Sequence, residues 1–177
     1  MRYISCFLIV GLLICPSFAS NQEQAEREPL PVGEDAPDFT LQDAEDQEHI
    51  LEKMRDKVVF LIMGNRKIRE EDDKWGHAFQ QDYQENDQVV AYIVADMRSV
   101  PAFVPKGFVK RQLKKDKPPV TLLLDWKGKV HQMYRTEKDK PNLYIIDPEG
   151  KLAFHIKSNF DQETYQKLKA VIDGFNN

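Results

Sequence analysis

The amino-acid sequence predicts an α/β domain built as a three-layer sandwich, in which helices cover both faces of a mixed central sheet. Two apolar runs, at 57–63 and 89–94, show the continuous hydrophobicity of strands that are buried on both faces. A segment with helical features follows each run, and such alternation implies parallel strands joined by right-handed crossovers. Closer to the C-terminus, a hairpin pattern leads into a last amphipathic helix and adds antiparallel strands.

Three helices are expected. Acids at 70–73 open the first helix, because negative side chains in a first turn complement the helix dipole. Its apolar stripe recurs every three or four residues, at Trp75, Ala78, Phe79 and Tyr83. The second helix covers 106–116, and the third runs from about Asp161, a suitable N-cap, to Phe175.

Two segments of similar sequence, 119–129 and 141–151, separate the second helix from the third. Their Pro, Asp, Gly and Lys residues are in register, and each predicts a strand that ends in a tight turn. We expect a further strand after each turn, at 130–134 and at 151–156. Two strand pairs would then precede the last helix.

The N-terminus predicts a cleaved secretory signal peptide over residues 1–19. Arg2 precedes an apolar run over 4–15, which is shorter than the roughly 20 residues that span a bilayer, and small residues lead up to Ala19. We therefore expect an exported protein, periplasmic or secreted, with no stable membrane anchor after cleavage. An uncleaved anchor and a lipoprotein modified at Cys15 are the alternatives. A flexible, Glu/Gln-rich leader follows over 20–32, and the domain covers 33–177.

Cysteine is confined to the predicted signal, at Cys6 and Cys15. The mature chain would have no disulfide, no thiolate nucleophile and no cysteine-ligated metal. The four histidines lack metal-ligand spacing, and no serine-hydrolase motif is present, so no cofactor is expected. With 29 acidic and 25 basic residues, the composition gives no basis for nucleic-acid binding.

Two motifs indicate a family. Residues 33–41 fit the pattern G-x-x-A-P-x-F-x-L, and the segment from Pro141 to Lys151 ends in D-x-x-G-K. Together they resemble the redoxins, the peroxiredoxin and TlpA-like branch of the thioredoxin fold, over about 33–175. The 64–66 junction is similar to that of YtfJ-like periplasmic relatives. The resemblance implies a cis-proline at Pro141 and an active site where the first core strand meets the first helix. It also implies that the strand pair at 119–134 is an insertion, because redoxins often carry an extra strand pair there.

That junction departs from the family pattern. Residues 64–70 contain no cysteine, and no serine or threonine that could replace it. Thiol chemistry is therefore not expected of this chain, which leads us to interpret it as a catalytically degenerate binding or adaptor module. The alternative is a redox-linked antioxidant or oxidoreductase that works with a thiol-bearing partner.

The candidate binding residues are Asn65, Arg66, Lys67 and Pro141. Positive charge beside a helix N-terminus favours anions, so a carboxylate or phosphate could dock there. The alternative is that Arg66 and Arg69 pair with the acids at 70–73.

The predicted second helix carries a basic face. Its lysines recur every four residues, at Lys106, Lys110 and Lys114. We expect this face to be a contact surface for a protein partner, and a solvated helix face is the alternative.

Overall fold

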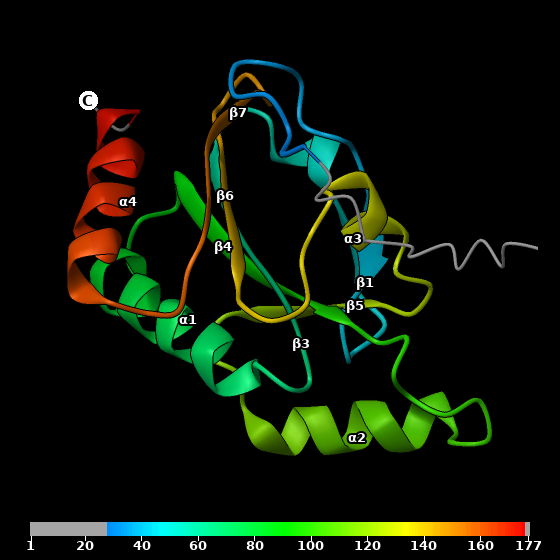
Figure 1. Ribbon diagram of the computed structural model, residues 1–177. Coiled ribbons are helices and arrows are strands. Elements are labelled where there is room, and N and C mark those ends of the chain that lie inside the picture. Colours follow the sequence, from blue (N-terminus) through cyan, green and yellow to red (C-terminus); the bar gives the residue numbers. More distant parts are fainter. Residues whose placement is uncertain (1–27, 176–177) are drawn as a thin grey trace, which may run out of the picture.

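The computed structural model describes residues 28–175 (Figure 1). The predicted signal peptide and residues 20–27 of the predicted leader lie outside this range. The strands are β1 (Thr40–Gln42), β2 (Glu48–Ile50), β3 (Val58–Asn65), β4 (Val89–Asp96), β5 (Thr121–Asp125), β6 (Asn142–Ile146) and β7 (Leu152–Lys157). The helices are η1 (Leu51–Met54), α1 (Arg69–Tyr83), α2 (Lys106–Asp116), α3 (Lys129–Met133) and α4 (Gln162–Gly174).

Five strands form the central sheet in the order β5-β4-β3-β6-β7. β3 pairs in parallel with β4, which pairs in parallel with β5, whereas β6 and β7 are antiparallel additions. β3 lies in the middle of the sheet, and its residues Val58 to Met63 are at most 1% exposed. The predicted mixed sheet is confirmed, and its central strand is the most continuous apolar run of the domain.

Helices and a small hairpin cover the two faces of the sheet. α1 and α4 pack on one face (Figure 1). Their residues Trp75, Phe79, Leu168 and Ile172 join the core there. α3, η1 and the separate β1–β2 pair cover the other face, with Phe39 and Tyr134 in a second core cluster. The three-layer sandwich is confirmed. Asp161 caps α4 as expected, because its carboxylate accepts a hydrogen bond from the Thr164 N–H at 2.8 Å.

The predicted strand at 130–134 is wrong, and so is the strand pair expected at 119–134. Residues Lys129–Met133 form the helix α3, and the protein's separate strand pair is β1–β2, near the N-terminus. The Asp125 carboxylate explains the difference: it accepts hydrogen bonds from the N–H groups of Lys129 and His131, which starts a helical turn. In the similar segment at 141–151, Asp147 holds only the N–H of Lys151, and the chain continues as the hairpin β6–β7.

The cis-proline expected at Pro141 is also wrong, since no peptide bond within residues 28–175 is cis. Pro141 does directly precede β6, the strand that feeds the terminal hairpin, as the topology predicted. The Asn142 side chain shapes the preceding loop: it accepts from the Glu137 N–H and donates to the carbonyls of Glu137 and Lys140. These bonds hold the loop with the ordinary trans isomer, which X–Pro bonds favour by about 0.5–1 kcal/mol.

α2 stands across the end of the sheet, apart from both helical layers (Figure 1). None of its residues is fully buried. Within residues 28–175, no helix combines the length and apolarity needed to cross a bilayer.

Candidate functional site

A cleft of about 460 Å³ opens where the parallel strands β3 and β4 end. It lies between the N-terminal turn of α1, the ends of these strands, the loop after β4 and helix α2. The carboxyl ends of parallel strands are the usual ligand-binding edge of open α/β sheets. The lining is mostly apolar, and its charged members are Arg66, Arg69, Asp72, Asp73, Asp96 and Asp116.

Asp72 is the unusual group of this cleft. The residue is only 3% exposed, and its Oδ1 has no hydrogen-bond partner within the described part of the chain. An unsatisfied buried polar atom costs about 1–3 kcal/mol, so its persistence calls for an explanation. Burial, helped by the nearby charges of Asp73 and Glu71, raises the pKa of Asp72 to about 8. At neutral pH the side chain is therefore a carboxylic acid that can donate a hydrogen bond.

The spacing of residues in the sequence indicates that Asp72 is buried. The interpretation of residues 70–73 as acids that open the helix overlooks this. Asp72 lies three residues before Trp75 and seven before Phe79, both of which are buried. It therefore belongs to the inward stripe of α1. Glu71 is an acid of the first turn, as predicted; it stays outside the core and pairs with Lys74 at 2.5 Å.

Gly64, near the end of β3, lies directly against Asp72. A Cβ at Gly64 would come within 2.0 Å of Asp72 Oδ2, so only glycine leaves room for the acid. On its other side, the Gly64 carbonyl oxygen accepts a hydrogen bond from Nε2 of His131 at 3.1 Å. The end of β3 is thus held between an acid from α1 and an imidazole from α3.

His131 is itself fixed by Asp125, whose Oδ2 lies 3.0 Å from His131 Nδ1. Both side chains are at most 4% exposed. Burial by itself would raise the pKa of Asp125, but hydrogen bonds from the side chain and backbone of His131 outweigh it and lower that pKa. Both ring nitrogens of His131 therefore face oxygen atoms, one of the Asp125 carboxylate and one of the Gly64 carbonyl. Asp125 and His131 form a buried hydrogen-bonded pair that positions the Gly64 carbonyl.

The predicted binding residues are only partly brought together. Asn65 and Arg66 line the cleft, whereas Lys67 and the buried Pro141 do not. The Asn65 side chain is occupied: its Nδ2 donates to the Lys138 carbonyl at 2.7 Å, and its Oδ1 accepts from the Lys67 N–H at 2.9 Å. It shapes the junction and ties it to the loop before β6.

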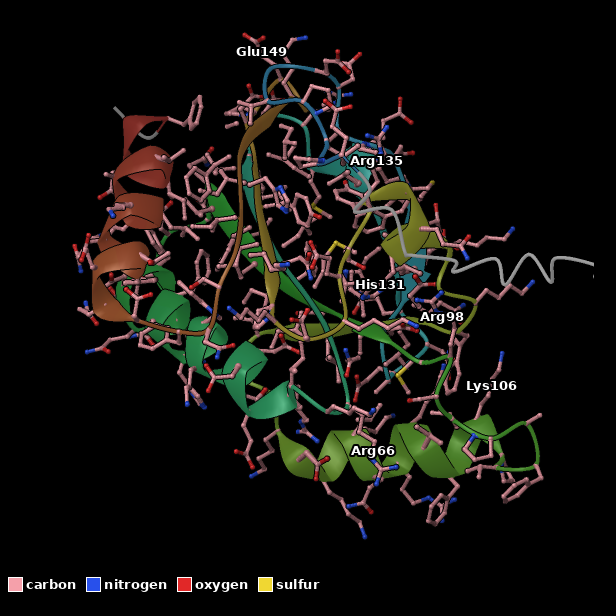
Figure 2. All side chains as sticks on the ribbon, viewed as in Figure 1. Arg66, Arg98, Lys106, His131, Arg135 and Glu149 are labelled. Atoms are coloured by element: carbon pink, nitrogen blue, oxygen red, sulfur yellow. The ribbon has the colours of Figure 1, made fainter. Side chains whose placement is uncertain are left out.

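The expected pairing of arginines with the acids of α1 occurs at one of the two positions. Arg69 reaches Asp73 at 3.5 Å and Asp116 of α2 at 2.6 Å. Arg66 is exposed and forms no ion pair within residues 28–175. It lines the cleft together with residues of α2 (Figure 2). Of the two cations that line the cleft, Arg66 is therefore the one without an ion pair within residues 28–175.

The basic face of α2 contacts other parts of the same chain. Lys110 pairs with Asp46 and is only 12% exposed, while Lys114 lies 3.6 Å from Glu45. Lys106 sits over the ring of Trp126 at 4.9 Å, near the N-terminal end of α2 (Figure 2). These contacts hold α2 against the turn after β1 and the turn after β5. A partner contact through the three lysines stays a prediction.

No group of three or more His, Cys, Asp or Glu residues within 28–175 is arranged to hold a metal ion. His155 lies on the edge strand β7 and stacks on Tyr144, with ring centroids 4.3 Å apart. Its burial lowers the pKa of the imidazole. The chemistry that this end of the sheet offers is hydrogen bonding and charge.

Comparisons with known proteins agree with this architecture. The family model of the AhpC/TSA family matches residues 32–155. A protein of Chlorobium tepidum described as a thiol:disulfide interchange protein DsbE is similar, with a TM-score of 0.67 and 20% identity over 84% of this chain and 99% of that one. A peroxiredoxin-like protein of Aquifex aeolicus gives 0.62 and 20%, over 83% and 91%. The exposed lipoprotein thioredoxin Etrx1 of Streptococcus pneumoniae gives 0.61 and 20%, over 76% and 99%.

At this identity the likenesses show the fold, which is thioredoxin-like with a five-stranded mixed sheet and an additional N-terminal strand pair. No curated protein matches the chain in sequence.

Proposed function

This chain belongs to the AhpC/TSA family, and on that premise we propose that it is a catalytically degenerate member that works as an exported binding or adaptor module. Residues 16–177 contain no cysteine, so a chain cleaved after Ala19 has no sulfur nucleophile. Export is part of the proposal and is supported by the signal-peptide pattern of residues 1–19.

The observation that carries the proposal is what occupies the β3–α1 junction. In the resembled family this junction holds a reactive thiolate. Here Gly64 packs against the buried acid Asp72, whose Oδ1 has no hydrogen-bond partner among residues 28–175, at the edge of an apolar cleft. A polar group buried in a concave apolar site is typical of ligand binding. We therefore assign the cleft as the binding site of the module.

The test of this proposal is an assay of thiol chemistry with two forms of the full chain. One form has the natural sequence, and the other carries Cys6→Ser and Cys15→Ser. We expect neither to reduce peroxide or the disulfides of insulin above a heat-denatured control.

Activity in the natural chain that disappears in the double variant would overturn the proposal by showing that Cys6 or Cys15 is retained and used. Activity in both forms would establish a redox reaction that needs no thiol of this chain. Turnover that appears only when a thiol-bearing redoxin is added would favour the redox-linked alternative.

A further inference from the structure

We infer that the cleft binds an amphiphilic carboxylate, with its apolar tail between α2 and β4 and its carboxylate held by Arg66 and Asp72. The inference rests on the proposed role of the cleft as the binding site, and it adds the chemical class of the ligand.

The walls of the cleft fit an apolar tail. β4 and β5 contribute Ile93 and Leu122, the loop after β4 contributes Val100 and Val104, and α2 contributes Phe108 and Leu113. Phe108 is 62% exposed although it lines the cleft, so a large aromatic surface at the rim lacks cover. A volume of about 460 Å³ lies within the ordinary range of small-molecule sites.

The polar end of the cleft fits a carboxylate. Asp72 is protonated at neutral pH, and its Oδ1 is buried without a partner within residues 28–175. A buried carboxylic acid of this kind donates a hydrogen bond to an oxyanion in known enzyme sites. Arg66 supplies a guanidinium that no carboxylate of the described chain engages. Both residues lie at the N-terminal end of α1, where the helix dipole favours negative charge.

The charges around Asp72 favour an anion over a cation. Three other carboxylates line the cleft, and each already faces an arginine: Asp96 pairs with Arg98 at 2.6 Å, while Asp73 and Asp116 share Arg69. A cationic ligand would have to ionise Asp72 against its burial and would approach two arginines. The charged or titratable groups around Asp72 are Arg66 before α1; Arg69, Glu71 and Asp73 on α1; Asp96 on β4; Asp116 on α2; and His131 on α3, behind Gly64.

Three probes with the same tail test the ligand class: decanoate and decyltrimethylammonium below their micelle concentrations, and decanol below its solubility limit. Amide NMR spectra of the ¹⁵N-labelled protein at pH 6.5 would follow each titration. We expect decanoate to bind at least about ten times more tightly than either other probe, with shifts concentrated at residues 64–73 and 93–116. Raising the pH to 9 should weaken decanoate binding, because Asp72 then becomes negative.

Variants assign the head group. Arg66→Gln should weaken decanoate binding about five-fold or more, whereas Lys115→Gln, which removes an exposed cation of α2 outside the cleft, should leave it unchanged. Asp72→Asn keeps a hydrogen-bond donor that does not ionise, so its decanoate affinity should no longer fall between pH 6.5 and 9.

Each remaining outcome overturns the inference. Tighter binding of decyltrimethylammonium or decanol at the cleft would reject the carboxylate class but keep the cleft as a binding site. Shifts outside the cleft, or no binding by any probe, would reject an amphiphile site there. The proposed function is judged separately by the thiol assays.

Discussion

His131 donates a hydrogen bond through Nε2 to the carbonyl oxygen of Gly64 at 3.1 Å, which joins residues 67 positions apart in the sequence. The Asp72 carboxyl group occupies the space where a side chain at position 64 would lie. One backbone position near the end of β3 is therefore held by α3 on one side and by α1 on the other. This arrangement fixes the inner end of the cleft, because neither helix can shift without disturbing Gly64.

The buried pair of Asp125 and His131 should contribute strongly to stability. Asp125→Asn replaces a buried carboxylate that accepts hydrogen bonds from the His131 ring and from two backbone N–H groups. We expect a loss of about 3 kcal/mol, because one hydrogen bond to a charged group contributes about 1.5–3 kcal/mol. Urea unfolding at pH 7 measures the loss. Since the pair lowers the pKa of Asp125, its contribution is present above about pH 4 and is lost as the pH falls through the folded-state value. The difference between variant and wild type should therefore shrink in acid.

Asp147→Asn is the matched control, because Asp147 holds the equivalent turn of the 141–151 segment without a histidine partner. Its carboxylate accepts from the Lys151 N–H at 2.8 Å. We expect a loss of about 1 kcal/mol, the worth of one ordinary hydrogen bond. Equal losses for the two variants would contradict a special role for His131.

Asp72 should destabilise the folded protein at neutral pH. Its pKa rises from an ordinary aspartate value to about 8 on folding, so the folded chain holds a proton that the unfolded chain has released. Stability contributed at this site therefore falls as the pH rises from about 4 to 8, by at most about 1.4 kcal/mol per pH unit. Asp72→Asn should be more stable than wild type at pH 7 by about 1–4 kcal/mol.

Urea unfolding at several pH values measures this gain, which should vanish near pH 4. Glu70→Gln, which changes an exposed acid of the same turn, is the control and should show no gain. A less stable Asp72→Asn protein at pH 7 would mean that the carboxylate is ionised and paired. A destabilising acid that persists in a cleft is typical of a functional site.

Gly64 and Asp72 should be energetically coupled. Gly64→Ala places a Cβ within 2.0–2.4 Å of three atoms of the Asp72 carboxyl group, which must then move. We expect Gly64→Ala to cost about 2 kcal/mol in the wild type and clearly less in Asp72→Ala, where the clashing atoms are gone. A double-mutant cycle by urea unfolding should give a coupling of at least about 1 kcal/mol. Additive losses would show that the glycine is required for its backbone alone.

The sequence predicted the fold better than the site, for a physical reason. Strands such as β3 and helices such as α4 follow from local periodicity and capping, which the chain displays directly. The turns after Asp125 and Asp147 are similar in sequence but differ in structure. The Asp125 carboxylate accepts a hydrogen bond from a second backbone N–H group, that of His131. A strand over 130–134 would have placed Gln132 on the same buried face as Val130 and Tyr134. The observed helix buries Val130 and Tyr134 and leaves Gln132 exposed.

The site depended on contacts between distant residues. The position of Arg66 before α1 was enough to predict it as a candidate binding residue. Its neighbour Arg69 pairs instead with Asp116, which is 47 residues away in the sequence and could not be predicted as its partner. The basic face of α2 could be recognised from its spacing, whereas its pairing with Glu45 and Asp46 required the position of the turn after β1. Asp72 was hidden by its acidic neighbours although its spacing placed it on the buried stripe.

Helix α2 should be held over the cleft by weak, salt-sensitive contacts. It has no fully buried residue, and its attachments include the Arg69–Asp116 pair at 2.6 Å and the ion pairs of Lys110 and Lys114. Exposed ion pairs contribute about 0–1 kcal/mol each and weaken with salt, so α2 should open far more readily than α1. Asp116→Asn should speed hydrogen exchange of residues 106–116 about two- to five-fold and change the global free energy of unfolding by less than about 1 kcal/mol. Salt at 0.5 M should have a similar effect on the wild type.

Glu163→Gln, which removes an ion pair within α4, is the control and should leave hydrogen exchange of α2 unchanged. Exchange in α2 as slow as in α1, insensitive to both the variant and salt, would show that packing and not ion pairs holds α2 in place.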